Sequence, residues 1–133
     1  MRAAMMMLAC ALVALVCWSQ SPTESHAMWI GVWQAKAENQ PGMTLTLADD
    51  GGDLGGTIVF EVINREENRL IGREPHTLMH AHVEGNVLSF QVNGCCNKSG
   101  ILSMAMELTK DGKAQFRCSN CGSGDVTELR KMQ

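Results

Sequence analysis

Apolar and polar side chains alternate with a period of two along most of this chain, and this alternation constrains the fold more than any other feature. In the clearest run Leu102, Met104, Met106 and Leu108 stand two residues apart, with polar or small residues between them. Similar runs occupy residues 43–47, 57–62, 88–92 and 114–118. Because successive side chains of a strand point to opposite faces, the pattern predicts antiparallel strands with one buried and one solvated face.

Turn-forming sequences separate these runs. Glycine with Asp or Asn recurs in DDGGDLGG, EGN and KDGK, where it supplies positive φ angles and local side-chain hydrogen bonds. Such spacing predicts one all-β domain, an eight-stranded antiparallel up-and-down β-barrel, with residues 64–76 as a long loop. The expected strands are 29–37, 43–48, 56–63, 77–83, 87–92, 101–109, 114–118 and 126–132.

In an up-and-down meander, alternate connections fall at opposite ends. The tight turns after residues 48, 83 and 109 therefore share one end, and the longer loops share the other. Both cysteine-bearing loops belong to the second set, so Cys95 and Cys96 are expected near Cys118 and Cys121. The barrel would have one closed end and one end rich in loops.

The amino-terminal residues have the layout of a secretory signal peptide. Arg2 precedes an apolar run at 3–18, and small residues flank His26 at a possible cleavage site after Ala27. The run is shorter than the roughly 20 residues of a membrane-spanning helix, which is the alternative interpretation. We expect residues 1–27 to be removed, leaving the domain 28–133 in the periplasm or outside the cell. Removal takes away one basic and one acidic residue, so the net charge stays at −3. With no Lys/Arg cluster, we expect no nucleic-acid partner. With no second long apolar run, we expect no membrane span in the mature chain.

Four cysteines remain after this cleavage, at 95, 96, 118 and 121. Export and an even number of cysteines favour two disulfides that join the two loops, with the pairing left open. A zinc site is one alternative, because Cys-x-x-Cys is a common half-site. Redox chemistry is another, although the reactive cysteine of such motifs usually begins a helix and here glycines follow.

Three histidines lie close together in EPHTLMHAHV. Strict alternation places His76, His80 and His82 on one outward face of the strand at 77–83, and Met79, Ala81 and Val83 on the inward face. A histidine pair two residues apart on a strand can bind zinc or copper, but the sequence shows no evident third ligand. We expect solvated histidines and no bound metal; the alternative is a site that His76 forms with the cysteines.

The first strand carries Gly31-Val32-Trp33, and this Gly-x-Trp resembles the signature of lipocalin-like (calycin) barrels. The resemblance implies that Trp33 packs at the closed base of the barrel and that a basic residue of the last strand crosses over it. Arg130 and Lys131 are both placed for this role, and we assign it to Arg130.

No conventional catalytic motif occurs, so we expect a non-enzymatic binding protein without a cofactor. The interior is rich in methionine, which adapts to irregular apolar ligands, although an ordinary packed core is the plainer alternative. The protein would hold a small apolar ligand in the barrel, or its disulfide-linked loops would contact another exported protein. The other hypotheses are a protease-inhibitor-like module with a filled barrel and a metal-binding protein. The candidate ligand-binding residues are Trp29, Phe60, Met79, Phe90, Met104 and Met106.

Overall fold

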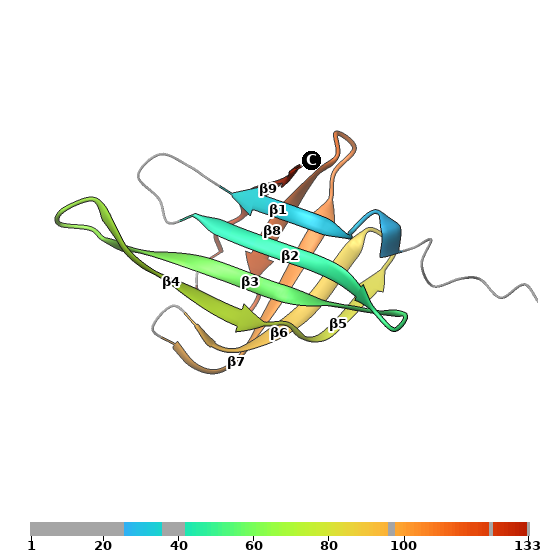
Figure 1. Cartoon of the computed structure of the whole chain (residues 1–133), viewed down its shortest axis with the longest axis horizontal. Helices are drawn as coiled ribbons and strands as arrows, with labels where there is room; N and C mark the ends of the chain where they lie inside the picture. Colours follow the sequence, from blue (N-terminus) through green and yellow to red (C-terminus); the bar gives the residue numbers. More distant parts are fainter. Residues whose placement is uncertain (1–25, 36–41, 96–97, 123, 133) are drawn as a thin grey trace, which may run out of the picture.

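The computed structural model describes residues 26–35, 42–95, 98–122 and 124–132. These residues form one antiparallel sheet of nine strands, in the order β4-β3-β2-β1-β9-β8-β7-β6-β5 (Figure 1). The strands are β1 (Gly31–Ala35), β2 (Met43–Asp50), β3 (Asp53–Asn64), β4 (Arg69–Thr77), β5 (Met79–Glu84), β6 (Val87–Cys95), β7 (Lys98–Leu108), β8 (Lys113–Cys118) and β9 (Thr127–Met132). The predicted signal peptide and Cys96 lie outside the described residues, apart from His26 and Ala27.

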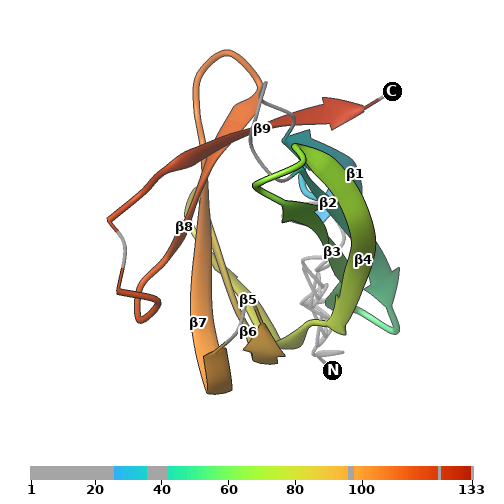
Figure 2. The same ribbon diagram turned by 90° about the vertical axis from the view of Figure 1, so that its left-hand side faces the viewer.

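The two edge strands of the sheet, β4 and β5, are consecutive in the chain and only Leu78 separates them. The segment from Arg69 to Glu84 pairs with β3 through its first half and with β6 through its second half. The sheet therefore curls around an interior, as Figure 2 shows, but hydrogen bonds do not close it into a barrel. This corrects the prediction of a closed barrel of eight strands.

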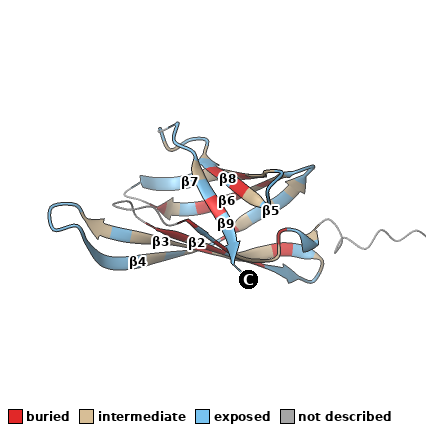
Figure 3. Ribbon diagram, turned by 90° about the horizontal axis from the view of Figure 1, so that it is seen from above, coloured by how far each residue is buried: buried red, intermediate tan, exposed pale blue. Residues whose placement is uncertain are grey.

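Strand β4 is the element that the sequence did not predict, since residues 64–76 read as a loop. Its side chains are mostly exposed, so its composition does not alternate between apolar and polar (Figure 3). A tight turn makes it pair with β3: the side chain of Asn64 accepts hydrogen bonds from the backbone N–H groups of Glu66 and Glu67, at 3.0 and 3.4 Å. Asn68 completes the turn with a φ of 51°, a conformation that asparagine tolerates.

A bulge in β5 changes which residues face the interior. His80 and Ala81 both lie opposite Phe90 of β6, because Met79 pairs with Gln91 and His82 pairs with Ser89. His80 has a φ of 53°, the left-handed conformation that glycine usually supplies in bulges of this type. Before the bulge the even-numbered residues face inward, and after it the odd-numbered ones do.

Met79 is displaced by this change of face. Directly opposite residues of an antiparallel pair share a face, so Met79 lies on the same outer side as Gln91. His76 lies opposite Ile58, which is completely buried, and therefore faces inward. The expectation that Met79 points inward and His76 outward is thus corrected for both residues.

The interior is a single cluster of buried apolar side chains. Its largest completely covered members come from six of the nine strands and from the segment before β1. They are Trp29, Trp33, Phe90, Leu45, Leu47, Ile58, Leu88, Met106, Leu129 and Val92. Gly56 allows β3 to approach β2 closely, because a Cβ at this position would collide with the carbonyl oxygen of Thr46. Burial of this apolar surface is the main source of the stability of the fold.

The two ends of the curled sheet differ. Strands β1, β3, β6 and β8 run in one direction and finish at what we call the loop end, whereas β2, β5, β7 and β9 finish at the turn end. Cys95 closes β6 and Cys118 closes β8, so both lie at the loop end. The predicted placement of these two cysteines at one end is confirmed. The additional strand does not change which connections share an end, because β4 and β5 together act as one bent strand of the meander.

Candidate binding site

The proposed ligand-binding residues are divided between the core and the outer surface. Trp29, Phe90, Met104 and Met106 belong to the buried cluster, with exposed fractions of 0 to 3%. Their side chains pack against other core residues and help to fill the interior. Phe60 is partly buried against the same cluster. Met79 lies outside it, for the reason given above.

The turn end is closed by the two tryptophans. The indole N–H of Trp33 donates a hydrogen bond to the carbonyl oxygen of Trp29 at 2.9 Å, so its only polar atom is satisfied although the ring is buried. The ammonium of Lys131 lies 5.7 Å from the centre of the Trp33 ring, within cation–π range, and donates to the carbonyl of Met28 at 3.2 Å. Gly31 leaves room for this cation, because a Cβ there would lie 2.9 Å from Cε of Lys131.

Lys131, rather than Arg130, is therefore the basic residue over the tryptophan. The two strands pair with Trp33 directly opposite Lys131, which puts both side chains on one face. Arg130 points to the other face, where its side chain is 70% exposed and contacts Glu128 at 3.3 Å. The sequence left these two residues unresolved, since the alternation of the last strand is weak.

The disulfide in the described residues joins Cys118 to Cys121 within one loop, instead of joining two loops. Hydrogen bonds hold this loop on β7. The Asn120 side chain accepts from the N–H of Ser103 at 2.8 Å and donates to the carbonyl of Ile101 at 3.0 Å. The ammonium of Lys98 donates to the carbonyl of Cys121. Cys95, at the end of β6, is buried. Backbone and amide contacts thus hold the disulfide loop on β7, where disulfides between two loops were predicted.

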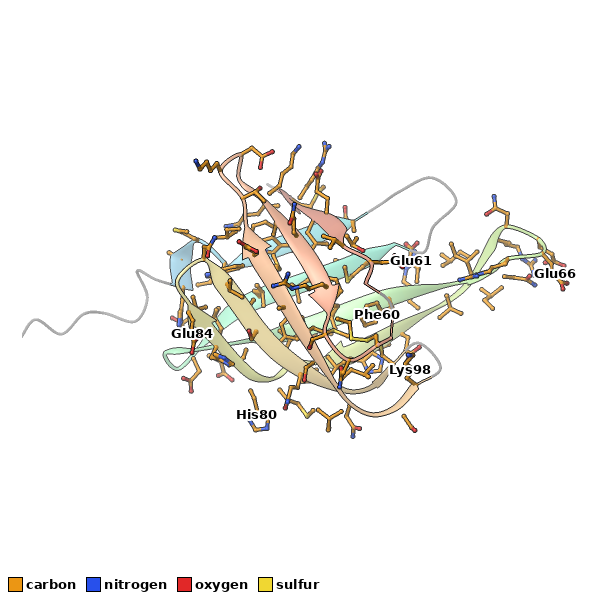
Figure 4. The ribbon with its side chains drawn as sticks, turned by 180° about the vertical axis from the view of Figure 1, so that it is seen from behind. Phe60, Glu61, Glu66, His80, Glu84 and Lys98 are labelled. Carbon is orange, nitrogen blue, oxygen red and sulfur yellow. A yellow bond between two sulfur atoms is a disulfide. The ribbon has the colours of Figure 1, made fainter. Side chains whose placement is uncertain are left out.

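The loop end also gathers exposed apolar side chains. Among the described residues, seven large hydrophobic side chains are exposed; five of them lie at the loop end and two at the turn end. Those at the loop end are Val62, Leu70, Ile71, Ile101 and Val126; those at the turn end are Met28 and Met132. Three of the five belong to the β3–β4 hairpin, whose tip at Glu66 stands away from the rest of the molecule (Figure 4). Exposed apolar side chains can mark a surface that contacts other proteins when they form a contiguous patch.

An ionisable pair faces the interior near this end. Nε2 of His76 lies 2.7 Å from Oε1 of Glu74, and the imidazole meets the Phe60 ring edge-on with centres 6.0 Å apart. The His76 side chain is 14% exposed and that of Glu74 is 40% exposed. The pair gives each polar side chain a hydrogen-bond partner at the edge of the core, as is usual for partly buried polar groups.

An open groove of about 410 Å³ lies on the outer face of β5, β6 and β7. Its lining includes outward-facing residues in register across the strands, with Gln91 opposite Ser103 and Ser89 opposite Ala105, together with Phe90 and Met104. The two imidazoles of His80 and His82 form its rim on β5, and Ser119 of the disulfide loop contributes at the other side. His80 stands at the outer margin of the sheet (Figure 4). Sequence reasoning named the two histidines but missed the groove, whose floor residues look like ordinary outward-facing positions.

Among the described residues, no group of three or more His, Cys, Asp or Glu side chains is arranged to hold a metal ion. Within the same part of the chain no helix is long and apolar enough to cross a membrane. Comparison with protein-family models, curated proteins and solved structures finds no match to this chain.

Proposed function

We propose that this chain is an exported, non-enzymatic binding protein and that its loop end is the surface that contacts another exported protein. The exposed apolar residues of the loop end carry this proposal. Ile71 is 57% exposed and Val126 is 55% exposed, although burying side chains of this size elsewhere is worth roughly 1.5–3 kcal/mol each. Their concentration at one end is the property expected of the centre of a protein interface.

The filled interior supports a protein partner over an apolar ligand. Phe90, Met104 and Met106 were the candidates for lining a ligand cavity, and each is covered by neighbouring core side chains. A ligand that entered among them would have to displace well-packed groups. The loop with the Cys118–Cys121 disulfide offers instead a surface that is already rigid, which lowers the entropic cost of binding.

The lipocalin-like resemblance is part of the same proposal. Three observations support it: the curled antiparallel meander, Trp33 buried at the turn end, and a lysine of the last strand over the Trp33 ring. Gly31 accounts for the glycine of the Gly-x-Trp, since it leaves space for Lys131. A fold of this type does not fix a function, so the interface proposal depends on the loop end alone.

Site-specific photo-cross-linking in cells that export the protein tests this interface. A photoreactive amino acid at Ile71 or Val126 is expected to give a defined adduct with one partner, and the same probe at Met132 of the turn end is not. Met132 is a matched control because it is also a large exposed apolar residue, at 49%.

Lysine substitutions then measure affinity for the captured partner. I71K and V126K should each weaken binding by at least about tenfold, as expected for an apolar anchor, whereas M132K should leave it unchanged. Equal adducts from both ends would refute the proposal. So would stoichiometric binding of an apolar fluorescent probe that Met106→Trp abolishes, because binding would then lie in the interior.

A further inference from the structure

We propose that His80 and His82 bind a divalent transition-metal ion of the zinc and copper class at the rim of the outer groove. Both imidazoles line this groove, which has a volume of about 410 Å³ and opens on the outer face of the sheet. Neither histidine is among the exposed apolar residues of the loop end. The existence of the site therefore does not depend on the protein interface proposed above.

The hydrogen bond of His82 prepares this side chain for ligation. Nδ1 of His82 lies 3.2 Å from the carbonyl oxygen of His80. A carbonyl oxygen can only accept, so Nδ1 must carry the proton, and Nε2 of the neutral ring keeps its lone pair. Metal-binding histidines in proteins commonly donate their second nitrogen to a backbone carbonyl in the same way.

The bulge brings the second imidazole to the same groove. With strict alternation, His80 and His82 would share a face with His76 and Leu78, and those two residues face the interior. The left-handed residue at position 80 reverses the faces, so that Ala81 packs on the core and His82 points out. His80 thus occupies a backbone conformation that glycine would adopt at a lower free-energy cost, and its side chain lines the groove.

The surrounding groups select the class of metal. No carboxylate, lysine or arginine is among the residues that line the groove. Ca²⁺ and Mg²⁺ need several charged oxygen ligands, whereas imidazole nitrogen suits zinc, copper and nickel. Two protein ligands leave coordination positions open toward the groove floor. Metal-bound water in those positions would meet the side chains of Ser89, Gln91 and Ser103, none of which makes a side-chain hydrogen bond to another described residue.

Isothermal titration of the exported protein with Zn²⁺ or Cu²⁺ alone, after treatment with a chelator, tests the site. We expect one ion per chain and a loss of affinity of at least about tenfold in both H80G and H82N. The control is H76Q, which removes an imidazole from the inner face and should leave affinity unchanged. A loss of affinity in H80G would not be explained by misfolding, because this substitution relaxes a strained backbone and should make the protein more stable than the parent.

Nitrogen NMR of the imidazole rings gives a second measurement. In the metal-free protein His82 should be the Nδ1–H tautomer, and Zn²⁺ should shift Nε2 of His82 while leaving the His76 ring unchanged. The proposal is refuted if no ion binds, or if binding survives both H80G and H82N. Loss of binding in H76Q alone would place the ion at the Glu74–His76 pair and would also refute it.

Discussion

The left-handed conformation of His80 predicts an unusual order of stability among substitutions at this position. A side chain with a Cβ costs roughly 1–2 kcal/mol in this region of φ, and glycine avoids that cost. Glycine also loses more backbone entropy on folding, which offsets roughly 0.5–1 kcal/mol. His80→Gly should therefore raise the free energy of unfolding by about 0.5–1 kcal/mol, although it removes a side chain.

The series H80G, H80N, H80A and H80V sharpens the test. Asparagine tolerates left-handed φ, alanine tolerates it less, and a β-branched valine least. Stability should thus fall from Gly through Asn to Ala and Val, with Val below the parent by about 1 kcal/mol or more. A strand propensity scale predicts the opposite order, since it places Val at the top and Gly near the bottom.

Urea and thermal unfolding followed by tryptophan fluorescence measure these differences. Trp29 and Trp33 are buried, so their emission reports loss of the core. A change of 1 kcal/mol corresponds to about 4–8 °C in Tm for a domain near 100 residues. The matched control is H82G, two residues further along a regular strand, which should destabilise by about 1 kcal/mol. If H80V proved at least as stable as H80G, the bulge at position 80 would be refuted.

Three further outcomes follow from the contacts described above. Gly56→Ala should lower stability by about 2–3 kcal/mol in urea unfolding, because its Cβ has no room against β2, whereas Gly55→Ala should be tolerated. Reduction of the described disulfide should cost only about 2 kcal/mol by the same assay, because it closes a loop of sequence separation 3. The pKa of Asp111 is held below its ordinary 3.8, chiefly by the Thr109 hydroxyl. This contribution to stability is present above pH 3.8 and is lost as pH falls through the lower folded pKa. Carbon NMR titration should show that Thr109→Val raises the Asp111 pKa and that Thr109→Ser does not.

The alternating runs predicted most of the sheet because their burial follows the period of two. β6 and β7 show the agreement best, with Leu88, Phe90 and Val92 buried opposite Met106, Met104 and Leu102. The pattern carries this information because each of these strands has one face on the core and one in water. Strand β4 has little burial, so its pairing depends on the Asn64 turn and on backbone hydrogen bonds, neither of which produces an apolar pattern.

The cysteines show where chemistry alone misleads. Export and an even count favoured cross-links between loops, and the meander correctly put both loops at one end. The sequence gives no distance between Cys95 and Cys118, however, and disulfide geometry tolerates only a narrow range of separations. The Cys-x-x-Cys spacing allowed a local bridge, and the Asn120 side chain supplied the contacts between the loop and β7.

Strand β5, in which a bulge reverses the two faces, is also the strand that carries the candidate metal ligands. His76 and Leu78 face inward, and unbroken alternation would bury His80 and His82 as well, leaving two imidazoles to be satisfied in an apolar core. Because His80 adopts the left-handed conformation, Ala81 and Val83 pack on the core in place of the two histidines, and His82 points outward. The segment passes from β3 to β6 just before this bulge, at Leu78, and Met79 already pairs with Gln91. Position 80 breaks the alternation of the strand, and histidine costs more free energy in this backbone conformation than glycine would. Such exceptions are expected at functional sites.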